Sequence, residues 1–83
     1  MAMMISVEQI KAARMLLRLS VFELADLAGV SSSTIKRLES LTDDTMPRAE
    51  TVLKIQAALE TQGIEFLGTA DESPGVRLHR RAR

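Results

Sequence analysis

The sequence contains no cysteine and no tryptophan, and no apolar run in it approaches the length of a membrane span. Without thiols, the chain can form neither a disulfide framework nor a cysteine-based metal site, which fits a reducing cytoplasm. Residues 1–5 are too few for the apolar core of a signal peptide. We therefore expect a cytoplasmic protein that has no contact with a membrane.

Residues suited to catalysis are also scarce. The single histidine, His79, lies in a basic tail, and no carboxylate or nucleophile stands at a spacing that would orient it. The sequence shows no cluster of metal-ligating residues and no glycine loop that could hold a phosphate. We expect a protein that is not an enzyme and that uses no cofactor and no metal.

Length and charge restrict the possible size of the core and the possible binding partners. With 83 residues the chain forms one small domain, which can bury only roughly 60 to 65% of its unfolded surface. Basic and acidic residues number 11 each, so the net charge is 0, whereas a protein that binds duplex DNA usually shows a basic footprint. The basic excess lies in the tail, which could anchor nucleic acid, contact an acidic partner or, as we favour, belong to a disordered terminus: Arg77, Arg80, Arg81 and Arg83.

A helix over residues 21–28 is predicted by its start and stop signals. Ser20 and Glu23 have the S-x-x-E form of a capping box. Gly29 follows the last periodic residue and can take the left-handed conformation that ends a helix. The chain should therefore turn sharply at Gly29.

A second helix should begin at once, because Ser31 can cap it. Its apolar positions, Ile35 and Leu38, lie three residues apart and should face inward. Four polar side chains share the opposite face: Ser32, Ser33, Lys36 and Arg37. Two short helices around a tight turn form a helix-turn-helix.

Two further helices should flank this motif. Ser6 and Gln9 form another capping box, so the first helix should run over residues 7–18. The last helix should cover residues 51–59 and end at Gly63. Its apolar stripe consists of Val52, Ile55, Ala58 and Leu59.

After Gly63 the hydrophobic period changes from helical to alternating, which predicts two short strands at residues 64–67 and 76–79. A lone two-stranded hairpin is marginal in water, and each strand leaves an unpaired edge. We therefore expect a homodimer through residues 64–79. The chain would then divide into a helix-turn-helix domain at 1–63 and a dimerisation segment with a basic tail at 64–83.

These residues resemble the Cro and C1-type repressor family, also called the XRE family, with the spacing intact over about residues 6–62. The matching residues are Ala13-Arg14, Leu19-Ser20, Glu23-Leu24-Ala25, Ala28-Gly29-Val30-Ser31, Thr34-Ile35, Leu38-Glu39 and Pro47. Many small bacterial members are also similar in the two strand segments, Gly63-Ile64-Glu65-Phe66 and Gly75-Val76-Arg77-Leu78. The resemblance implies a mainly α, lambda repressor-like bundle of four helices that contains the helix-turn-helix, followed here by two short C-terminal β-strands.

The resemblance also implies roles for individual residues. The second helix of the motif would enter the major groove, where Ser32, Ser33 and Arg37 correspond to the base-contacting positions and Lys36 lies alongside. Arg37 can make a bidentate contact to guanine, and Thr34 could contact a phosphate. The alternative is that the two cations only solvate an exposed helix face.

A structural pair is implied as well. In the family, the arginine at position 14 pairs with the glutamate that closes the recognition helix, here Glu39. Together with Gly29 in the turn, Arg14 and Glu39 would hold the motif in shape. Two separately solvated charges are the other possibility.

Two features depart from the family's pattern. Val21 stands where a glutamine commonly contacts the DNA backbone, Phe22 follows at a normally polar site, and neither can bind a phosphate. The next loop carries Asp43 and Asp44, which a duplex would repel. Exposed apolar residues beside a helix-turn-helix favour a protein-binding face. However, Phe22 could also fold back against the first helix, and the aspartates could cap the fourth.

We therefore expect a sequence-specific DNA-binding transcription regulator that acts as a dimer on operator DNA. The alternative is an antiactivator that uses the helix-turn-helix face, with Val21 and Phe22, to bind and inhibit another transcription regulator. A third possibility is an antitoxin that does both.

Overall fold

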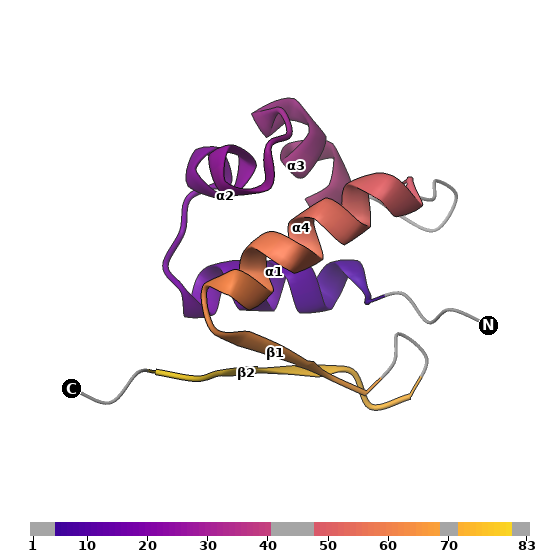
Figure 1. Cartoon of the computed structure of the whole chain (residues 1–83). Coiled ribbons are helices and arrows are strands. Elements are labelled where there is room, and N and C mark those ends of the chain that lie inside the picture. The colour runs from indigo at the N-terminus through magenta and orange to yellow at the C-terminus, as the bar shows by residue number, and fades with distance from the viewer. Residues whose placement is uncertain (1–4, 41–47, 69–71, 81–83) are drawn as a thin grey trace.

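A computed structural model of the chain describes residues 5–40, 48–68 and 72–80 (Figure 1). The elements are α1 (Val7–Leu16), α2 (Val21–Ala28), α3 (Ser32–Glu39), α4 (Ala49–Thr61), β1 (Ile64–Leu67) and β2 (Gly75–Leu78). The predicted mainly α fold of four helices with a short C-terminal sheet is confirmed. The expected loop with Asp43, Asp44 and Pro47, and the tail arginines Arg81 and Arg83, lie outside the described residues.

Helix α1 begins where the sequence predicts but ends earlier. The expected end at Arg18 is wrong, because the helix stops at Leu16 and Arg18 has a left-handed φ of 57°. The Arg18 N–H donates to the Met15 carbonyl and the Leu19 N–H to the Arg14 carbonyl, both at 3.0 Å. This is the bond pattern of a Schellman end, in which a glycine is usual. Because Arg18 occupies this position instead of glycine, the sequence contains no local signal for the end of the helix.

Helix α4 is longer than the predicted 51–59 and runs over Ala49–Thr61. Gly63 lies two residues past its end and has a φ of 102°. A side chain there would begin 2.7 Å from the carbonyl oxygen of His79, so both the backbone angle and the space require glycine. The chain can therefore turn directly from α4 into β1.

The core is built from all four helices and the first residue of β1. The apolar positions predicted on α3 and α4 are buried, except for Ala58, which is half-buried against the core. The buried cluster comprises Ile10, Ala13, Leu24, Ala25, Ala28, Ile35, Leu38, Val52, Ile55, Leu59 and Ile64. Since Ile64 belongs to it, β1 continues the packing of the helices.

The two strands form an antiparallel hairpin that packs against α1 and α4 (Figure 1). Its register pairs Ile64 with Leu78 and Phe66 with Val76, and these side chains face the core. The polar residues of the opposite face also meet. Among them, Nε2 of His79 lies 2.7 Å from Oε1 of Glu65.

This polar contact affects the titration of Glu65. The hydrogen bond with His79, helped by the charge of Arg77 at 3.6 Å, lowers the pKa of the Glu65 carboxyl below its ordinary value. The side chains of Arg77 and His79 are largely open to solvent, and that of Glu65 is 44% exposed. They therefore make the outer face of the hairpin polar and charged rather than apolar.

Gln9 joins the start of α1 to the far end of this hairpin. Its amide Nε2 donates to the carbonyls of Leu67 and Gly75, each at 2.9 Å, and its Oε1 accepts from the Ser6 N–H at 2.8 Å. The side chain is 2% exposed, and Leu67 and Gly75 are the last pair of the strand register. One capping residue thus also holds the sheet against the helices.

In the part of the chain that the structure describes, no helix is both long enough and apolar enough to cross a membrane.

The Gln9 amide gives the first prediction. Gln9→Glu replaces the donor with an oxygen that faces two carbonyl oxygens in a buried site, and should lower the free energy of unfolding at pH 7 by at least about 2 kcal/mol. The introduced carboxyl should have a raised pKa when folded, because burial and the carbonyl oxygens disfavour its charge. The loss of unfolding free energy relative to the wild type should therefore be small below about pH 4, near the pKa of the carboxyl in the unfolded chain. It should grow as the pH rises from there through the folded pKa.

Urea unfolding at pH 4 and pH 7, compared with the wild type at each pH, measures this effect. Gln9→Met is the matched control, because it removes the same two hydrogen bonds without adding a charge and should show no such pH dependence. Equal losses for both variants at both pH values would contradict the assigned contact.

Candidate nucleic-acid interface

Helix α2 and the turn after it are set by local hydrogen bonds. Ser20 Oγ accepts from the Glu23 N–H at 3.0 Å, and Glu23 Oε1 accepts from the Ser20 N–H at 2.8 Å, so the predicted capping box is present. Gly29 has a φ of 71° and no atom within 4 Å of the place where a Cβ would stand. It is therefore the backbone conformation, rather than lack of space, that requires glycine there.

Helix α3 is fixed in rotation by its cap and its two apolar residues. The Thr34 N–H donates to Ser31 Oγ at 3.1 Å, while Ile35 and Leu38 are buried. Because residues three and four apart share one face of a helix, burying these two directs the opposite face to solvent. The core thus decides which side chains α3 presents.

The outward face of α3 contains three of the five side chains predicted to contact DNA. Ser33, Lys36 and Arg37 are exposed, whereas Ser32 and Thr34 are half-buried. The Thr34 hydroxyl also lies 2.8 Å from the hydroxyl of Ser31, within the cap. The structure therefore brings a serine and two cations together on one exposed surface.

Arg14 and Glu39 join α1 to the end of α3. Nε and Nη2 of Arg14 donate to the two carboxylate oxygens of Glu39 at 2.7 and 2.9 Å, and Nη1 donates to the Leu19 carbonyl at 2.8 Å. The side chains are only 16% and 10% exposed. Hydrogen bonding to Glu39 raises the pKa of Arg14, against the opposing effect of burial. A bidentate, charge-assisted pair of this kind fixes both position and orientation.

The two apolar residues at the start of α2 differ in their surroundings. Val21 is half-buried and packs against the core, whereas Phe22 is 59% exposed. Phe22 is therefore not buried against the first helix. Instead, the Nζ of Lys36 lies 4.8 Å from the centroid of its ring, within the range of a cation–π contact.

No signal in the sequence indicates this contact. Phe22 and Lys36 lie on different helices, and no local periodicity relates them. In the part of the chain that the structure describes, neither Lys36 nor Arg37 has a carboxylate within 4.0 Å. Both cations are thus available to an external anion.

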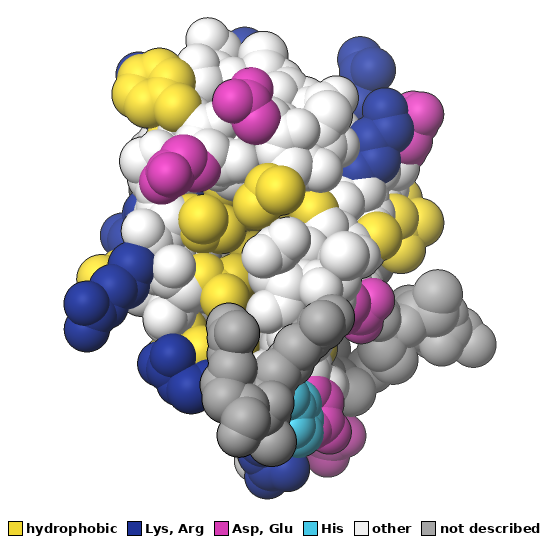
Figure 2. All heavy atoms as spheres, turned by 60° about the vertical axis from the view of Figure 1, so that its left-hand side comes forward, with side chains coloured by type: hydrophobic (Ala, Val, Ile, Leu, Met, Phe, Trp, Pro, Cys, Tyr) yellow, Lys and Arg dark blue, Asp and Glu magenta, His cyan; other side chains and the backbone are white. Residues whose placement is uncertain are grey.

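Charge is not spread evenly over the molecule. On the face that Figure 2 presents, hydrophobic side chains gather in the middle and Lys and Arg side chains stand at the margins. This face therefore has no broad basic surface that could bind a duplex without regard to sequence. A duplex that met this face would have to depend on a few individual side chains.

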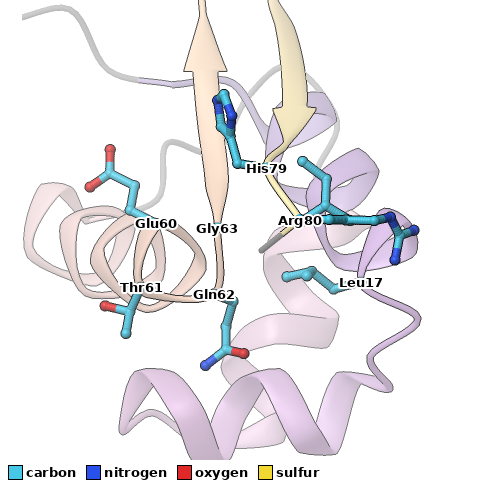
Figure 3. A pocket seen from close by; sticks show the side chains of 8 residues that line it. Leu17, Glu60, Thr61, Gln62, Gly63, His79 and Arg80 are labelled. Atoms are coloured by element: carbon cyan, nitrogen blue, oxygen red, sulfur yellow. The ribbon is translucent and has the colours of Figure 1, made fainter. Parts of the chain in front are cut away.

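A hollow lies apart from the helix-turn-helix, where the ends of α1, α4 and β2 meet (Figure 3). Leu17 and Leu78 are among its lining residues, but its polar side chains do not converge, since Glu60 points to one side and Arg80 to the other. Among the described residues, no group of three His, Cys, Asp or Glu side chains could hold a metal ion. The surface around α3 remains the better candidate for a site.

Comparison with known families agrees with this geometry. A family model described as helix-turn-helix (HTH_3) matches residues 10–66, which include α2, the turn and α3. The match covers more than half of the chain, and the protein therefore belongs to this Cro/C1-type, or XRE, helix-turn-helix family. It is a family of DNA-binding regulators rather than of enzymes. No curated protein matches the sequence.

The ion pair between α1 and α3 gives a second prediction. Arg14→Met leaves the Glu39 carboxylate largely buried without its partner and should lower the free energy of unfolding by roughly 3 to 5 kcal/mol. The double variant, Arg14→Met with Glu39→Leu, has no lone charge in this site. Its loss of unfolding free energy should therefore be smaller than the sum of the losses of the two single variants.

Thermal and urea unfolding of the two single variants and the double variant complete this cycle. Arg14→Lys is the matched control, since it keeps the charge and loses the bidentate geometry, and it should be intermediate. Strictly additive losses would show that the two side chains do not act as a pair.

Proposed function

We propose that this DNA-binding helix-turn-helix protein recognises specific operator sequences and regulates transcription as a dimer. The observation that carries the proposal is the exposed face of α3. It presents Ser33, Lys36 and Arg37 to solvent, with both cations free of ion pairs among the described residues. The buried Ile35 and Leu38 hold this face outward.

The residues on this face suit different contacts. Arg37 can donate two parallel hydrogen bonds to O6 and N7 of a guanine in the major groove. The short hydroxyls of Ser32 and Ser33 reach a phosphate or a bridging water more readily than a base, and Thr34 shares its hydroxyl with the helix cap. Sequence readout would therefore rest mainly on Arg37.

A dimer is supported by the two outer edges of the hairpin, which pair with no other strand among the described residues. The His79 N–H donates to the Gly63 carbonyl at 2.8 Å, and hydrogen-bonded pairs alternate along an antiparallel ladder. The ladder between the strands therefore uses Glu65 and Arg77, and the N–H and C=O groups of Ile64 and Phe66 point to the outer edge of β1. An unpaired edge of this kind can bind a second copy of the same strand.

Charge distinguishes the possible pairings. A two-fold axis at Phe66 of β1 sets Glu65 opposite Leu67 of the partner subunit, without a clash of like charges. An axis at Glu65 would set two glutamates opposite each other, which is destabilising. For a dimer formed along β1, charge therefore favours the axis at Phe66.

The third prediction concerns this dimer. Leu67→Lys would place a cation opposite Glu65 of the partner subunit, twice by symmetry, and should tighten association by roughly 0.2 to 1 kcal/mol per pair. Leu67→Glu makes the same change of size and polarity with the opposite charge and should weaken association. Sedimentation equilibrium measures both; shifts in the same direction would contradict the β1 pairing.

The fourth prediction tests recognition of DNA. Arg37→Ala should weaken binding to an operator from the protein's own upstream region by roughly 1 to 3 kcal/mol and relax its sequence preference. Arg80→Ala, which removes an exposed arginine beyond β2, is the matched control for charge and should change binding less. Fluorescence anisotropy with operator and scrambled duplexes gives both values.

The exposure of Phe22 favours a second candidate, an antiactivator that binds another transcription regulator. There Phe22 would be an aromatic anchor, whose truncation often costs 2 kcal/mol or more, on the order of a hot spot. Loss of regulation in cells on Phe22→Ala and Val21→Gln, while the wild-type protein shows no selective duplex binding, would replace the operator proposal with this one.

A further inference from the structure

We infer that Phe22 positions the ammonium of Lys36 for a phosphate of the DNA backbone, and so leaves Arg37 as the residue that reads bases. This inference rests on the proposed binding of operator DNA. It assigns a positioning role to the aromatic side chain at the second position of α2, a site that is normally polar in the family.

The geometry of the two side chains carries the inference. Phe22 is the second residue of α2 and is 59% exposed, and Nζ of Lys36 on α3 lies 4.8 Å from its ring centroid. The ring contacts one side of the ammonium and accepts no conventional hydrogen bond. The N–H groups on the other sides therefore stay available to an oxygen anion.

The contact with the ring should favour binding of a phosphate by Lys36 for an entropic reason. A lysine side chain carries about 2 kcal/mol of rotamer entropy, part of which is lost when the ammonium is fixed on a phosphate. A contact that already restricts the side chain in the free protein reduces that loss. In the described part of the chain, no carboxylate within 4.0 Å competes for Lys36.

The same contact separates the two neighbouring cations of α3. Lys36 is drawn toward the start of α2, on the flank of the recognition helix, whereas Arg37 is exposed with no such ring contact among the described residues. Backbone contacts set the position of a protein on DNA, and base contacts set its sequence preference. Lys36 thus belongs to the first class and Arg37 to the second.

A double-mutant cycle in DNA binding tests this assignment. Phe22→Leu should weaken binding about two- to five-fold on operator and scrambled duplexes alike, because only a backbone contact is affected. In a Lys36→Met background the same change should have no further effect. Phe22→Tyr, which keeps the ring, should bind within about two-fold of the wild type.

The salt dependence gives an independent readout. Lys36→Met should lower the slope of log affinity against log salt concentration by about one, the value for one lost phosphate contact. Lys11→Met removes an exposed lysine from α1 and is the matched control for charge. In the free protein, the ε-methylene protons of Lys36 should show an upfield ring-current shift that Phe22→Leu abolishes.

The outcomes separate this inference from the proposed function. If the wild type binds the operator but Phe22→Leu weakens binding equally with and without Lys36, the positioning role is wrong while operator binding stands. The same holds if Phe22→Leu affects only the operator duplex, or if the ring-current shift is missing. If the wild type binds neither duplex, both proposals fall together.

Discussion

One guanidinium connects the three segments on which the recognition surface depends. Arg14 of α1 bonds both carboxylate oxygens of Glu39 at the end of α3 and also the Leu19 carbonyl in the turn before α2. Each bond uses a different nitrogen, so the planar group fixes the angle between the segments as well as their distance. The short helices α2 and α3, with eight residues each, would be marginal alone. Their arrangement depends on this pair and on the core beneath it.

The elements best predicted from the sequence are those whose limits are marked locally. Helix α2 has the bounds predicted for it, because a capping box stands at its start and Gly29 at its end. The range predicted for helix α1 is two residues too long, because its left-handed end is occupied by Arg18 instead of glycine. The capping role of Gln9 was visible in the sequence, but its bonds to the hairpin were not, because its partners are backbone groups far along the chain.

The candidate site is also predictable only where local sequence patterns determine it. Helical spacing assigned Ile35 and Leu38 to the core and Lys36 to the outer face of α3, and the structure agrees. The sequence does not show whether Phe22 is buried or exposed, because its exposure depends on how α2 packs against its neighbours. In a protein with no net charge, contact with DNA then depends on the placement of single cations, so side-chain geometry matters more here than total charge.

The bonds of Gln9 to the hairpin also bear on the order in which the chain folds. They join residues 58 and 66 positions apart, so nearly the whole chain must be looped before they can form. Such contacts gain nothing until the segments between them have collapsed. The far end of the hairpin should thus dock last and exchange its amide hydrogens first. In the proposed dimer, association would stabilise this late-forming end by mass action, and the fold of each subunit would then depend on protein concentration.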